Sequence, residues 1–496
     1  MLVPLSKLMT SVDNAVANMG LCSGYVFALT SGAGIEVPFL LDNLERAVIR
    51  VVDKWSLLRG QPVWLDEEDI WAINVPDDLP SVQKPFLFTA TTLQTSYAEA
   101  VCRSSPPTPL STVSPCGFQA QPDMAYFRHP HLPSTFAAYA DSGASLLAVH
   151  VTVFSDAVAV GLATPHGLFD ATGLGYAVRA VNAELSGGMW TVPASSPVNG
   201  LDQAIQGLDG DGTGDLADIP DGLAGWVPAL STLPVLKFLA NYLYEKLWHR
   251  DEPAYIFLGG HAVDGFVKSV KDEVENMTNG RAWVSKGDVL TAWLLKNAHA
   301  ADQDARTSVV ASAVYTLRAL FPLASYPHNA MIPYPLMPEP ISAVTLSTLS
   351  IAQLALIHRQ SLSDSRNIPY VNAVIHKMRD APLIPEHSWP WAGLLRGGPR
   401  PPFRWISSNQ TTSGVADLQL PMCACAPRRA CGEGSDAVLD TLAYYMVVIS
   451  AIKDHQVFRF QANSVGVFLE GSMRRERWRN VAEAVRLLEK EYGIPQ

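Results

Sequence analysis

Hydrophobic residues alternate with small or polar ones over two neighbouring segments, residues 147–153 and 158–162. Successive side chains of a strand point to opposite faces of a sheet, so this alternation predicts two strands. Ser155 and Asp156 lie between the segments and suit a two-residue turn. The pattern therefore predicts a β-hairpin in the first half of the chain.

A proline marks the end of the second expected strand. Pro165 cannot donate a hydrogen bond to a neighbouring strand and keeps Thr164 extended, so we expect the strand to end there. Apolar residues then recur at helical spacing up to Gly187, namely Leu174, Ala177, Val178, Val181 and Leu185. The segment HGLFD, residues 166–170, is therefore expected on a strand-to-helix turn, with His166 directly after the strand.

Other elements are expected from the same periodicities. A helix follows Pro38, with one apolar stripe formed by Leu41, Leu44, Val48, Val51 and Trp55. Ser285 and Asp288 resemble a capping box before the apolar run VLTAWLL, and a further helix is expected at about 350–360. LAYYMVVISA and SVGVFLEG are typical of buried strands, and the last helix is expected to end at Gly493.

Length and composition predict two globular domains. At 496 residues the chain exceeds what one hydrophobic core usually organises. Hydrophobic residues make up 48% and charged residues 17%, a balance that allows large buried cores. Residues 104–134 are rich in proline and predict an irregular loop, whereas 198–225 is rich in glycine and aspartate and is typical of an exposed connection. We expect an N-terminal domain at 1–197, a crossover connection at 198–250 and a C-terminal domain at 251–496.

Charge and hydropathy restrict the partners and the compartment. A formal net charge of −11 argues against a nucleic-acid partner, since phosphate recognition needs a concentrated basic face. No stretch reaches the ~18 uninterrupted apolar residues of a membrane helix, so no membrane span is expected. The first residues also lack the basic and apolar regions of a signal peptide. We therefore expect a cytoplasmic protein, and we expect it to be a monomer.

His166 has the side chain that acyl transfer requires. Transfer from a thioester to a hydroxyl or amine needs a base that takes the acceptor's proton and then returns a proton to the leaving thiolate. Histidine, with an unperturbed pKa near ~6.5, can do both at neutral pH. Asp170 follows one helical turn later and could pair with an arginine or orient the imidazole, and spacing alone does not choose between these roles. The alternative is a chance surface pair, because H-x-x-x-D occurs by chance in many chains of this length.

The chain resembles the BAHD acyltransferases, in particular their filamentous-fungal branch that modifies secondary metabolites. Their signature H-x-x-x-D-G reads here HGLFD followed by Ala171. Further similar segments are LLDNLERAVIRVVDKWSLLRG, VSKGDVLTAWLLK, LRALFPLASYPHNA and LSIAQLALIHRQS. The resemblance implies an α/β fold of the mixed α+β kind, with two chloramphenicol-acetyltransferase-like domains, each a mixed β-sheet flanked by helices. It also implies that His166 lies midway along a channel between them, which acyl-CoA and the acceptor enter from opposite sides.

The resemblance also concerns Asp170. It implies that Asp170 is structural and pairs with an arginine that the sequence does not identify. Ser285 and Lys286, within VSKGDVLTAWLLK, are the candidates for contact with acyl-CoA. The family's second hallmark, DFGWG, has no match, and the corresponding region reads SSNQTTSGVADLQLP. Since losing one preorganised oxyanion donor typically costs ~100- to 1000-fold in rate, we expect Ser408 or Asn409 to contribute one; the alternative is a polar loop that makes turn hydrogen bonds.

No metal and no permanently bound cofactor are expected. Cys423, Cys425 and Cys431 have no nearby histidine or fourth cysteine, and their spacing matches no common structural zinc site. Gly173 and Gly175 fall one glycine short of a dinucleotide fingerprint, and entry into the helix explains them.

We therefore expect an acyl-CoA-dependent O-acyltransferase that acts on a hydrophobic small-molecule alcohol, with His166 as general base and no covalent acyl-enzyme. Acyl-CoA is then a co-substrate. Two alternatives stay open. One is a repurposed enzyme of the same fold that catalyses condensation or cyclisation, or that takes its acyl group from a carrier protein. The other is a non-catalytic protein that binds small molecules.

Overall fold

The computed structural model describes most of the chain. It covers residues 2–5, 19–29, 35–67, 70–76, 85–102, 108–194, 226–228, 251–301, 308–321, 323, 325–337, 341–380, 383–385, 403–426, 437–450 and 457–494. The expected crossover connection at 198–250 lies outside the described residues except for 226–228, and Cys431 also lies outside them. No helix within these ranges has the length and apolar character needed to cross a bilayer.

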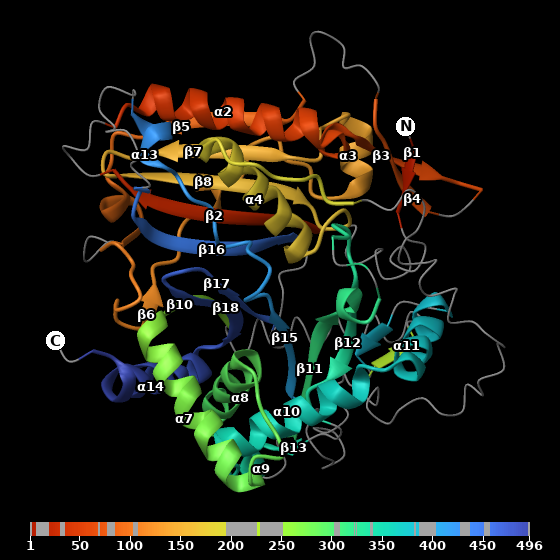
Figure 1. The fold of residues 1–496 in the computed structure, drawn as a ribbon, viewed down its shortest axis with the longest axis vertical. Coiled ribbons are helices and arrows are strands. Elements are labelled where there is room, and N and C mark those ends of the chain that lie inside the picture. Colours follow the sequence, from red (N-terminus) through yellow and green to blue (C-terminus); the bar gives the residue numbers. More distant parts are fainter. Residues whose placement is uncertain are drawn as a thin grey trace, which may run out of the picture.

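The first sheet has five strands and occupies the upper part of the view in Figure 1. Its order is β16 (Thr441–Ser450), β2 (Met19–Ala28), β8 (Ala157–Pro165), β7 (Ala148–Val153) and β5 (Leu87–Thr92). The sheet is mixed, because β5 runs parallel to β7 and the other neighbours are antiparallel. Helices α2 (Val37–Lys54) and α4 (Ala171–Ser186) share one hydrophobic core with one face of this sheet.

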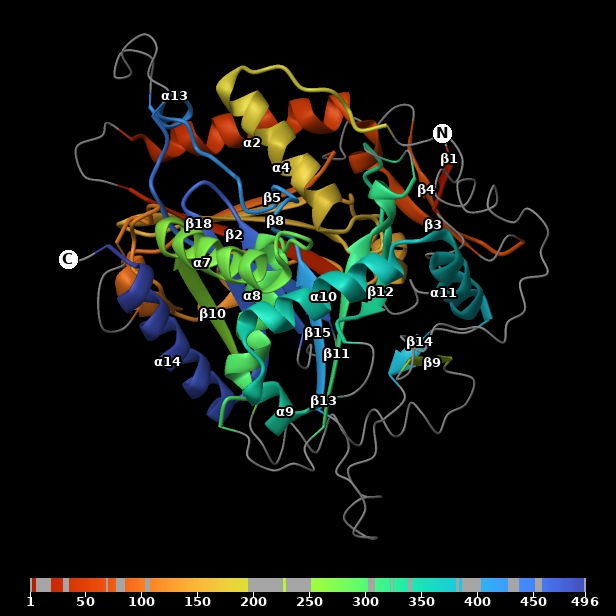
Figure 2. The same cartoon turned by 60° about the horizontal axis from the view of Figure 1, so that its bottom comes forward.

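The second sheet forms the other half of the molecule. Its order is β12 (Met331–Pro335), β11 (Ser308–Thr316), β15 (Phe403–Asn409), β17 (Val457–Ala462), β18 (Gly466–Arg474), β10 (Asp251–Gly259) and β6 (Gly117–Gln119), with β13 (Ile341–Ser342) beside β11. Helices α7 (Gly260–Thr278), α8 (Lys286–Ala298), α10 (Ile351–Ser365) and α14 (Arg475–Tyr492) contribute to its core, and Figure 2 brings them forward. Two mixed sheets flanked by helices are therefore confirmed.

Smaller elements complete the described chain. One three-stranded sheet has the order β1 (Leu2–Pro4), β4 (Ile70–Asn74), β3 (Gln61–Leu65), and β9 (Trp226–Pro228) pairs with β14 (Leu383–Pro385). The short helices are α3 (Phe136–Ser142), α9 (Ala343–Thr348), α11 (Ile368–Asp380) and α13 (Met422–Cys425). Single turns are η1 (Ser56–Arg59), η2 (Ala98–Cys102), η3 (Met124–Tyr126) and η5 (Leu317–Ala319).

Each large sheet takes one strand from the other half of the chain. Strand β16 comes from the C-terminal half and pairs with β2, whereas β6 comes from the N-terminal half and pairs with β10. The prediction of a wholly irregular loop over 104–134 is therefore wrong at β6. Three residues are too few to show an alternating pattern. The strand β6 is therefore recognised from its pairing with Tyr255, Ile256 and Phe257 and not from its own sequence.

The hairpin and the helix around HGLFD are confirmed. Strands β7 and β8 pair in antiparallel fashion, with Val153 opposite Val158 and a tight turn at Ser155 and Asp156. Strand β8 ends at Pro165, and α4 ends before Gly187, whose φ of 72° needs a residue without Cβ. Every residue of both strands is buried, because the strands are central in a sheet covered on both faces.

The other expected elements are present as well. Helix α2 buries the predicted stripe except for Leu41, which is half-buried at its edge. Ser285 caps α8 in a capping box with Asp288, and the helices expected near 350–360 and before Gly493 are α10 and α14. The described residues of LAYYMVVISA lie in β16, and SVGVFLEG runs into β18.

Candidate active site

His166 is held where β8 ends. Its main-chain amide still donates to the Met19 carbonyl at 2.8 Å, so the residue stays at the edge of the first sheet. Its half-buried imidazole lies with Nδ1 3.1 Å from the carbonyl oxygen of Phe169. A carbonyl only accepts, so Nδ1 carries the ring proton, and Nε2 is the basic nitrogen of the neutral ring.

Asp170 begins α4 and binds to the second half of the chain. Its Oδ1 accepts from the main-chain amides of Thr172 at 3.0 Å and Gly173 at 3.1 Å, which makes it the N-cap of the helix. The same carboxylate receives two bonds from Arg318, with Nη1 2.7 Å from Oδ2 and Nη2 3.1 Å from Oδ1. The two side chains are only 2% and 7% exposed. Arg318 is therefore the arginine that the resemblance implies, and this ion pair joins the two halves at the motif.

The segment of residues 326–330 lies on the motif turn. Arg318 also donates to the carbonyls of Tyr326, at 2.8 Å, and His328. Helix α4 comes so close that a Cβ added to Gly173 would lie 2.1 Å from the Pro327 carbonyl oxygen. His328 and Asn329 bind carbonyls of the motif. The sequence did not indicate this role, because the segment LRALFPLASYPHNA was identified only by its similarity to the family.

Two buried histidines of the second half, His328 and His358, have lowered pKa values. Burial lowers the pKa of His328 to about 4, and the neighbouring charge of Arg318 lowers it as well. Burial likewise lowers the pKa of His358, on α10, to about 4. Both side chains are therefore uncharged at neutral pH.

The loop of residues 410–420 lies within SSNQTTSGVADLQLP, the segment expected to correspond to the DFGWG hallmark. This loop binds the first half through its main chain: the Ser413 carbonyl accepts from Arg179 at 2.8 Å, and the Asp417 carbonyl accepts from Asn182 at 2.6 Å. A Cβ added to Gly175 would lie 2.0 Å from the Ser413 carbonyl oxygen. Close approach of these two backbone segments therefore explains Gly173 and Gly175, the glycines that resemble an incomplete dinucleotide fingerprint.

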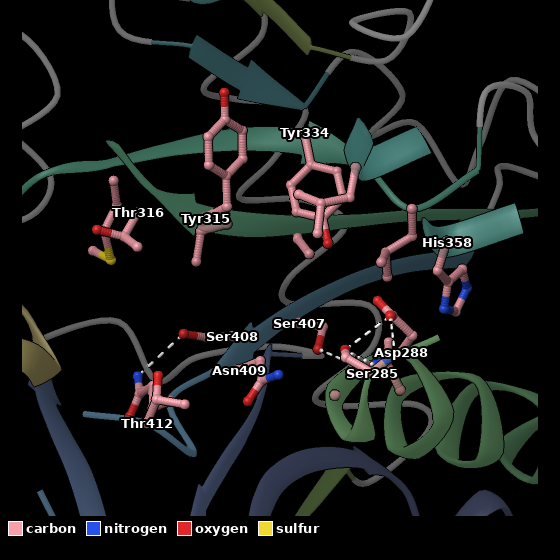
Figure 3. A pocket seen from close by; sticks show the side chains of 18 of the residues that line it. Ser285, Asp288, Tyr315, Thr316, Tyr334, His358, Ser407, Ser408, Asn409 and Thr412 are labelled. Carbon is pink, nitrogen blue, oxygen red and sulfur yellow. Dashed lines mark hydrogen bonds between the residues drawn. The ribbon is translucent and has the colours of Figure 1, made fainter. Parts of the chain in front are cut away.

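A cavity of about 350 Å³ lies beside the motif and takes its walls from both halves of the chain. Among the described residues of the first half, those that line it are 170–172, at the end of the motif turn. Figure 3 shows the polar side chains that the second half contributes, among them Ser285, Asp288, Tyr334, His358, Ser407, Ser408 and Asn409. His166 is not among the lining residues, so a channel with His166 midway along it stays a prediction.

Ser408 and Asn409 both line this cavity, at the end of β15. The Ser408 hydroxyl accepts from Gln410 Nε2 at 3.1 Å. Asn409 Oδ1 accepts from the amide and the hydroxyl of Thr411, at 3.1 and 2.8 Å. Its Nδ2 lies over α8, where a Cβ added to Gly287 would come within 1.7 Å of it. Each residue therefore makes a turn hydrogen bond and also borders the cavity.

The two residues expected to contact acyl-CoA, Ser285 and Lys286, line different cavities. Ser285 lines the cavity beside the motif, and its hydroxyl donates to Asp288 Oδ2 at 2.8 Å, a carboxylate that also pairs with Arg359. Lys286 instead lines a second hollow of about 280 Å³ and pairs with Asp264, with Nζ 2.8 Å from Oδ1. Both side chains of that pair are exposed.

The cysteines near the 410–420 loop are thiols. Cys423 is exposed and Cys425 is buried, with Sγ 3.2 Å from the Pro421 carbonyl oxygen. Over the described ranges, no group of three histidine, cysteine, aspartate or glutamate side chains could hold a metal ion.

Comparisons with known proteins give sequence relatives over half of the chain. No family model matches. Acetyltransferase BOT5 of Botryotinia fuckeliana is 26% identical over 234 residues, which are 45% of this chain and 41% of that protein. O-acetyltransferase PaAT-2 of Phomopsis amygdali is 23% identical over 50% of this chain and 52% of its own length, and O-acyltransferase ausP of Penicillium brasilianum is 27% identical over 51% and 50%. The matched part of the chain thus spans about half the length of these curated relatives.

Solved structures match over nearly the whole chain. TRI101 of F. graminearum, in complex with coenzyme A and deoxynivalenol, has a TM-score of 0.62 at 12% identity and covers 99% of this chain and 98% of its own. Vinorine synthase has a TM-score of 0.54 at 12% identity, over 98% and 93%. At these identities the likeness establishes the fold. The chain has the two-domain fold of the BAHD acyltransferases and is related in sequence to fungal acetyltransferases and O-acyltransferases, which confirms the resemblance indicated by its motifs.

Proposed function

We propose that the protein transfers an acyl group from acyl-CoA to a hydroxyl group of a hydrophobic small molecule, with His166 as the general base. The observation that carries this proposal is the bond from His166 Nδ1 to the Phe169 carbonyl, because it leaves Nε2 as the proton acceptor. The names of the relatives support acyl transfer, and the coenzyme A in TRI101 supports this class of donor.

The reaction then needs two proton movements at one nitrogen. Nε2 of His166 takes the proton of the acceptor hydroxyl while the acceptor oxygen attacks the thioester carbonyl carbon. The tetrahedral intermediate collapses, the carbon–sulfur bond breaks, and the proton on Nε2 passes to the departing thiolate. The imidazolium formed between these steps keeps its second proton on Nδ1, directed at the Phe169 carbonyl. The products are the ester and coenzyme A, and the histidine ends in its starting state.

We propose that Asp170 supports this chemistry by holding the motif turn. Its carboxylate accepts hydrogen bonds from the first amides of α4 and from Arg318, so it holds the motif turn in place. The role that we assign to Asp170 is therefore structural.

Ser408 and Asn409 are our candidates for oxyanion donors. Ser408 accepts from Gln410, which leaves its own hydroxyl proton for donation, and Asn409 uses its oxygen in the turn, which leaves its amide hydrogens for the cavity side. A lost oxyanion donor typically costs ~100- to 1000-fold in kcat. Kinetics of Ser408→Ala and Asn409→Ala test this role, and unchanged turnover in both variants contradicts it.

Ser285 and Lys286 are our candidates for contact with acyl-CoA. Ser285 borders the cavity at the start of α8. Lys286 is paired with Asp264 at the surface, where an ion pair is worth little, so a phosphate group could replace the carboxylate. On this proposal Lys286→Ala raises the KM for acetyl-CoA and leaves kcat unchanged.

The proposed function is tested with purified protein, a panel of acyl-CoAs and hydrophobic secondary alcohols. Released thiol is followed with a chromogenic disulfide, and the ester is identified by mass spectrometry. Thiol release that depends on both substrates supports the proposal. No acceptor-dependent thiol release with any acyl-CoA contradicts it.

A further inference from the structure

We propose that Asn329 and His328 are positioning residues for acyl transfer, because they hold the main chain of the motif turn and so fix the direction in which His166 presents Nε2. This inference rests on the proposed function and assigns what the second half of the chain contributes to the same histidine.

Every carbonyl of residues 166–169 accepts a hydrogen bond from a side chain. Asn329 Nδ2 lies 2.7 and 3.0 Å from the oxygens of the first two. His328 Nδ1 lies 3.1 Å from the oxygen of the third, and His166 itself binds the fourth. Four consecutive peptide groups are thus oriented by side chains, and the first three depend on the second half of the chain.

The chemistry of Asn329 determines which way its amide points. The side chain is buried at 3% exposure, and its Oδ1 has no hydrogen-bond partner among the residues that the structure describes. Reversing the amide would set Oδ1 against two carbonyl oxygens, which is repulsive. A buried acceptor without a partner is itself unfavourable, so the two bonds that Nδ2 donates are the interactions that keep Asn329 in place.

His328 is a fixed donor with a defined tautomer. Its side chain is buried, and its ring centroid lies 6.0 Å from that of Phe169 and 5.2 Å from that of Tyr326. Because it is neutral at ordinary pH, it carries one ring proton, and the Leu168 carbonyl retains that proton on Nδ1. His328 therefore donates to the turn and has no charge that would disturb the Asp170–Arg318 pair.

The orientation of His166 depends on the same turn. Its Nδ1 proton is held by the Phe169 carbonyl, and the direction of that carbonyl follows from the three peptide groups before it. If these groups rotate, the acceptor for Nδ1 moves, and Nε2 turns away from the acceptor hydroxyl. A displacement of about 1 Å at a reacting group can cost ~100-fold in rate. We therefore expect loss of kcat without loss of acyl-CoA binding.

The first test compares two asparagines. Asn329→Ala removes both donations to the motif, whereas Asn43→Ala removes one similar bond, from Nδ2 to the Ala424 carbonyl at 3.2 Å, away from the motif. With acetyl-CoA and an alcohol of the panel, Asn329→Ala is expected to lower kcat by ~100-fold with a KM for acetyl-CoA close to that of the parent. Asn43→Ala is expected to retain the parental kcat. Equal kcat values in the two variants, or a loss in Asn329→Ala that lies only in KM, overturn the proposal.

The second test uses two replacements of similar size at His328. The amide nitrogen of Asn reaches the position of Nδ1, and that of Gln reaches the position of Nε2, so only His328→Asn retains the donor to Leu168. His328→Asn is expected to keep most of the parental kcat, and His328→Gln is expected to lose it. A merely structural role predicts similar losses in both variants. If Asn329→Ala does not fold, the comparison of His328→Asn with His328→Gln still tests the positioning role.

A third readout does not require activity. Nitrogen NMR of histidine-labelled protein, with His166→Gln used to assign the signals, reports the tautomer of His166. The parent and His328→Asn are expected to show the single Nδ1-protonated form, and Asn329→Ala and His328→Gln a mixture. An unchanged tautomer in all variants overturns the positioning role. Absence of thiol release by the parent would refute the proposed function, and the NMR result would still decide the positioning role.

Discussion

Two loops meet between the halves of this molecule, the motif turn at 166–170 and the loop at 410–420, and they are held in reciprocal ways. The motif turn comes from the first half, and its carbonyls accept from His328 and Asn329 of the second. The 410–420 loop comes from the second half, and its carbonyls accept from Arg179 and Asn182 of the first. In both cases the main chain of one half is bound by side chains of the other.

The two loops differ in the kinds of side chain that their contacts require. The motif turn needs a carboxylate at Asp170 for the buried pair with Arg318, and it needs the imidazole of His166. The 410–420 loop contributes main-chain carbonyls, which any residue supplies, and apolar side chains buried in the first core, namely Val415, Ala416, Leu418 and Leu420. The contacts of this loop with the first half therefore come from its main chain and its apolar side chains.

The largest stability effect is expected at the buried ion pair. Arg318→Met leaves the Asp170 carboxylate buried without its cation, and removing one partner of such a pair typically costs about 3–5 kcal/mol. The free energy of unfolding, measured by urea denaturation, should fall by this amount. The double variant Asp170→Asn with Arg318→Met should lose less than the sum of the single variants. A loss below about 1 kcal/mol in Arg318→Met would contradict the distinction between the two loops.

Acid should act on the motif turn more than on the 410–420 loop. His328 has its pKa lowered by burial to about 4 in the folded protein, whereas an unfolded histidine titrates near ~6.5. Unfolded chains therefore bind the proton first, so the stability is fully present above pH ~6.5 and is lost as the pH falls toward 4. For this one residue the loss at pH 4.5 is about 2–3 kcal/mol.

The contribution of His328 can be isolated with His328→Asn. This variant keeps the donor to Leu168 and removes the titratable ring, so its unfolding free energy should fall less steeply between pH 7 and 4.5 than that of the parent. His358, with a similarly lowered pKa, continues to contribute in both proteins. Identical pH dependence in parent and variant would show that His328 is not the neutral donor described above.

A smaller effect is expected where α4 binds the 410–420 loop. Asn182 donates to the Asp417 carbonyl at 2.6 Å and accepts from the Gln419 amide at 2.9 Å. Asn182→Ala should lower the unfolding free energy by about 1–2 kcal/mol, because both loop groups lose a partner that is partly buried. Thr412→Ala, at an exposed side chain of the loop, is the control and should stay within about 0.5 kcal/mol of the parent. Equal effects in both variants would mean that Asn182 does not hold the loop.

Local periodicity predicts the elements of the motif well. Alternation marks β7 and β8, Pro165 marks the end of β8, and apolar spacing marks α4, because each signal lies within a few residues of what it determines. The partners of the motif could not be predicted in this way. Arg318 and Asp170 are 148 positions apart, and although Arg318 lies in the similar segment LRALFPLASYPHNA, no local pattern pairs it with Asp170.

Long-range pairing limits the prediction of the fold for the same reason. The sequence of β16 indicates a buried strand and not the sheet that contains it, since its partner β2 is more than 400 residues away. The three-residue strand β6 has no pattern of its own. Among the residues expected to act together, Ser285, Ser408 and Asn409 border one cavity, whereas Lys286 borders another, a separation that depends on which side of α8 each residue faces.

The role of His166 as the base for acyl transfer can be measured by comparing the turnover of two histidine variants. The rate of acceptor-dependent thiol release from acetyl-CoA is measured for the parent, His166→Gln and His131→Gln, the last being an exposed histidine outside the proposed site. If His166 is the base, turnover is expected to fall at least ~100-fold for a folded His166→Gln protein and to stay at the parental value for His131→Gln. A folded His166→Gln protein that retains near-parental turnover would contradict this role.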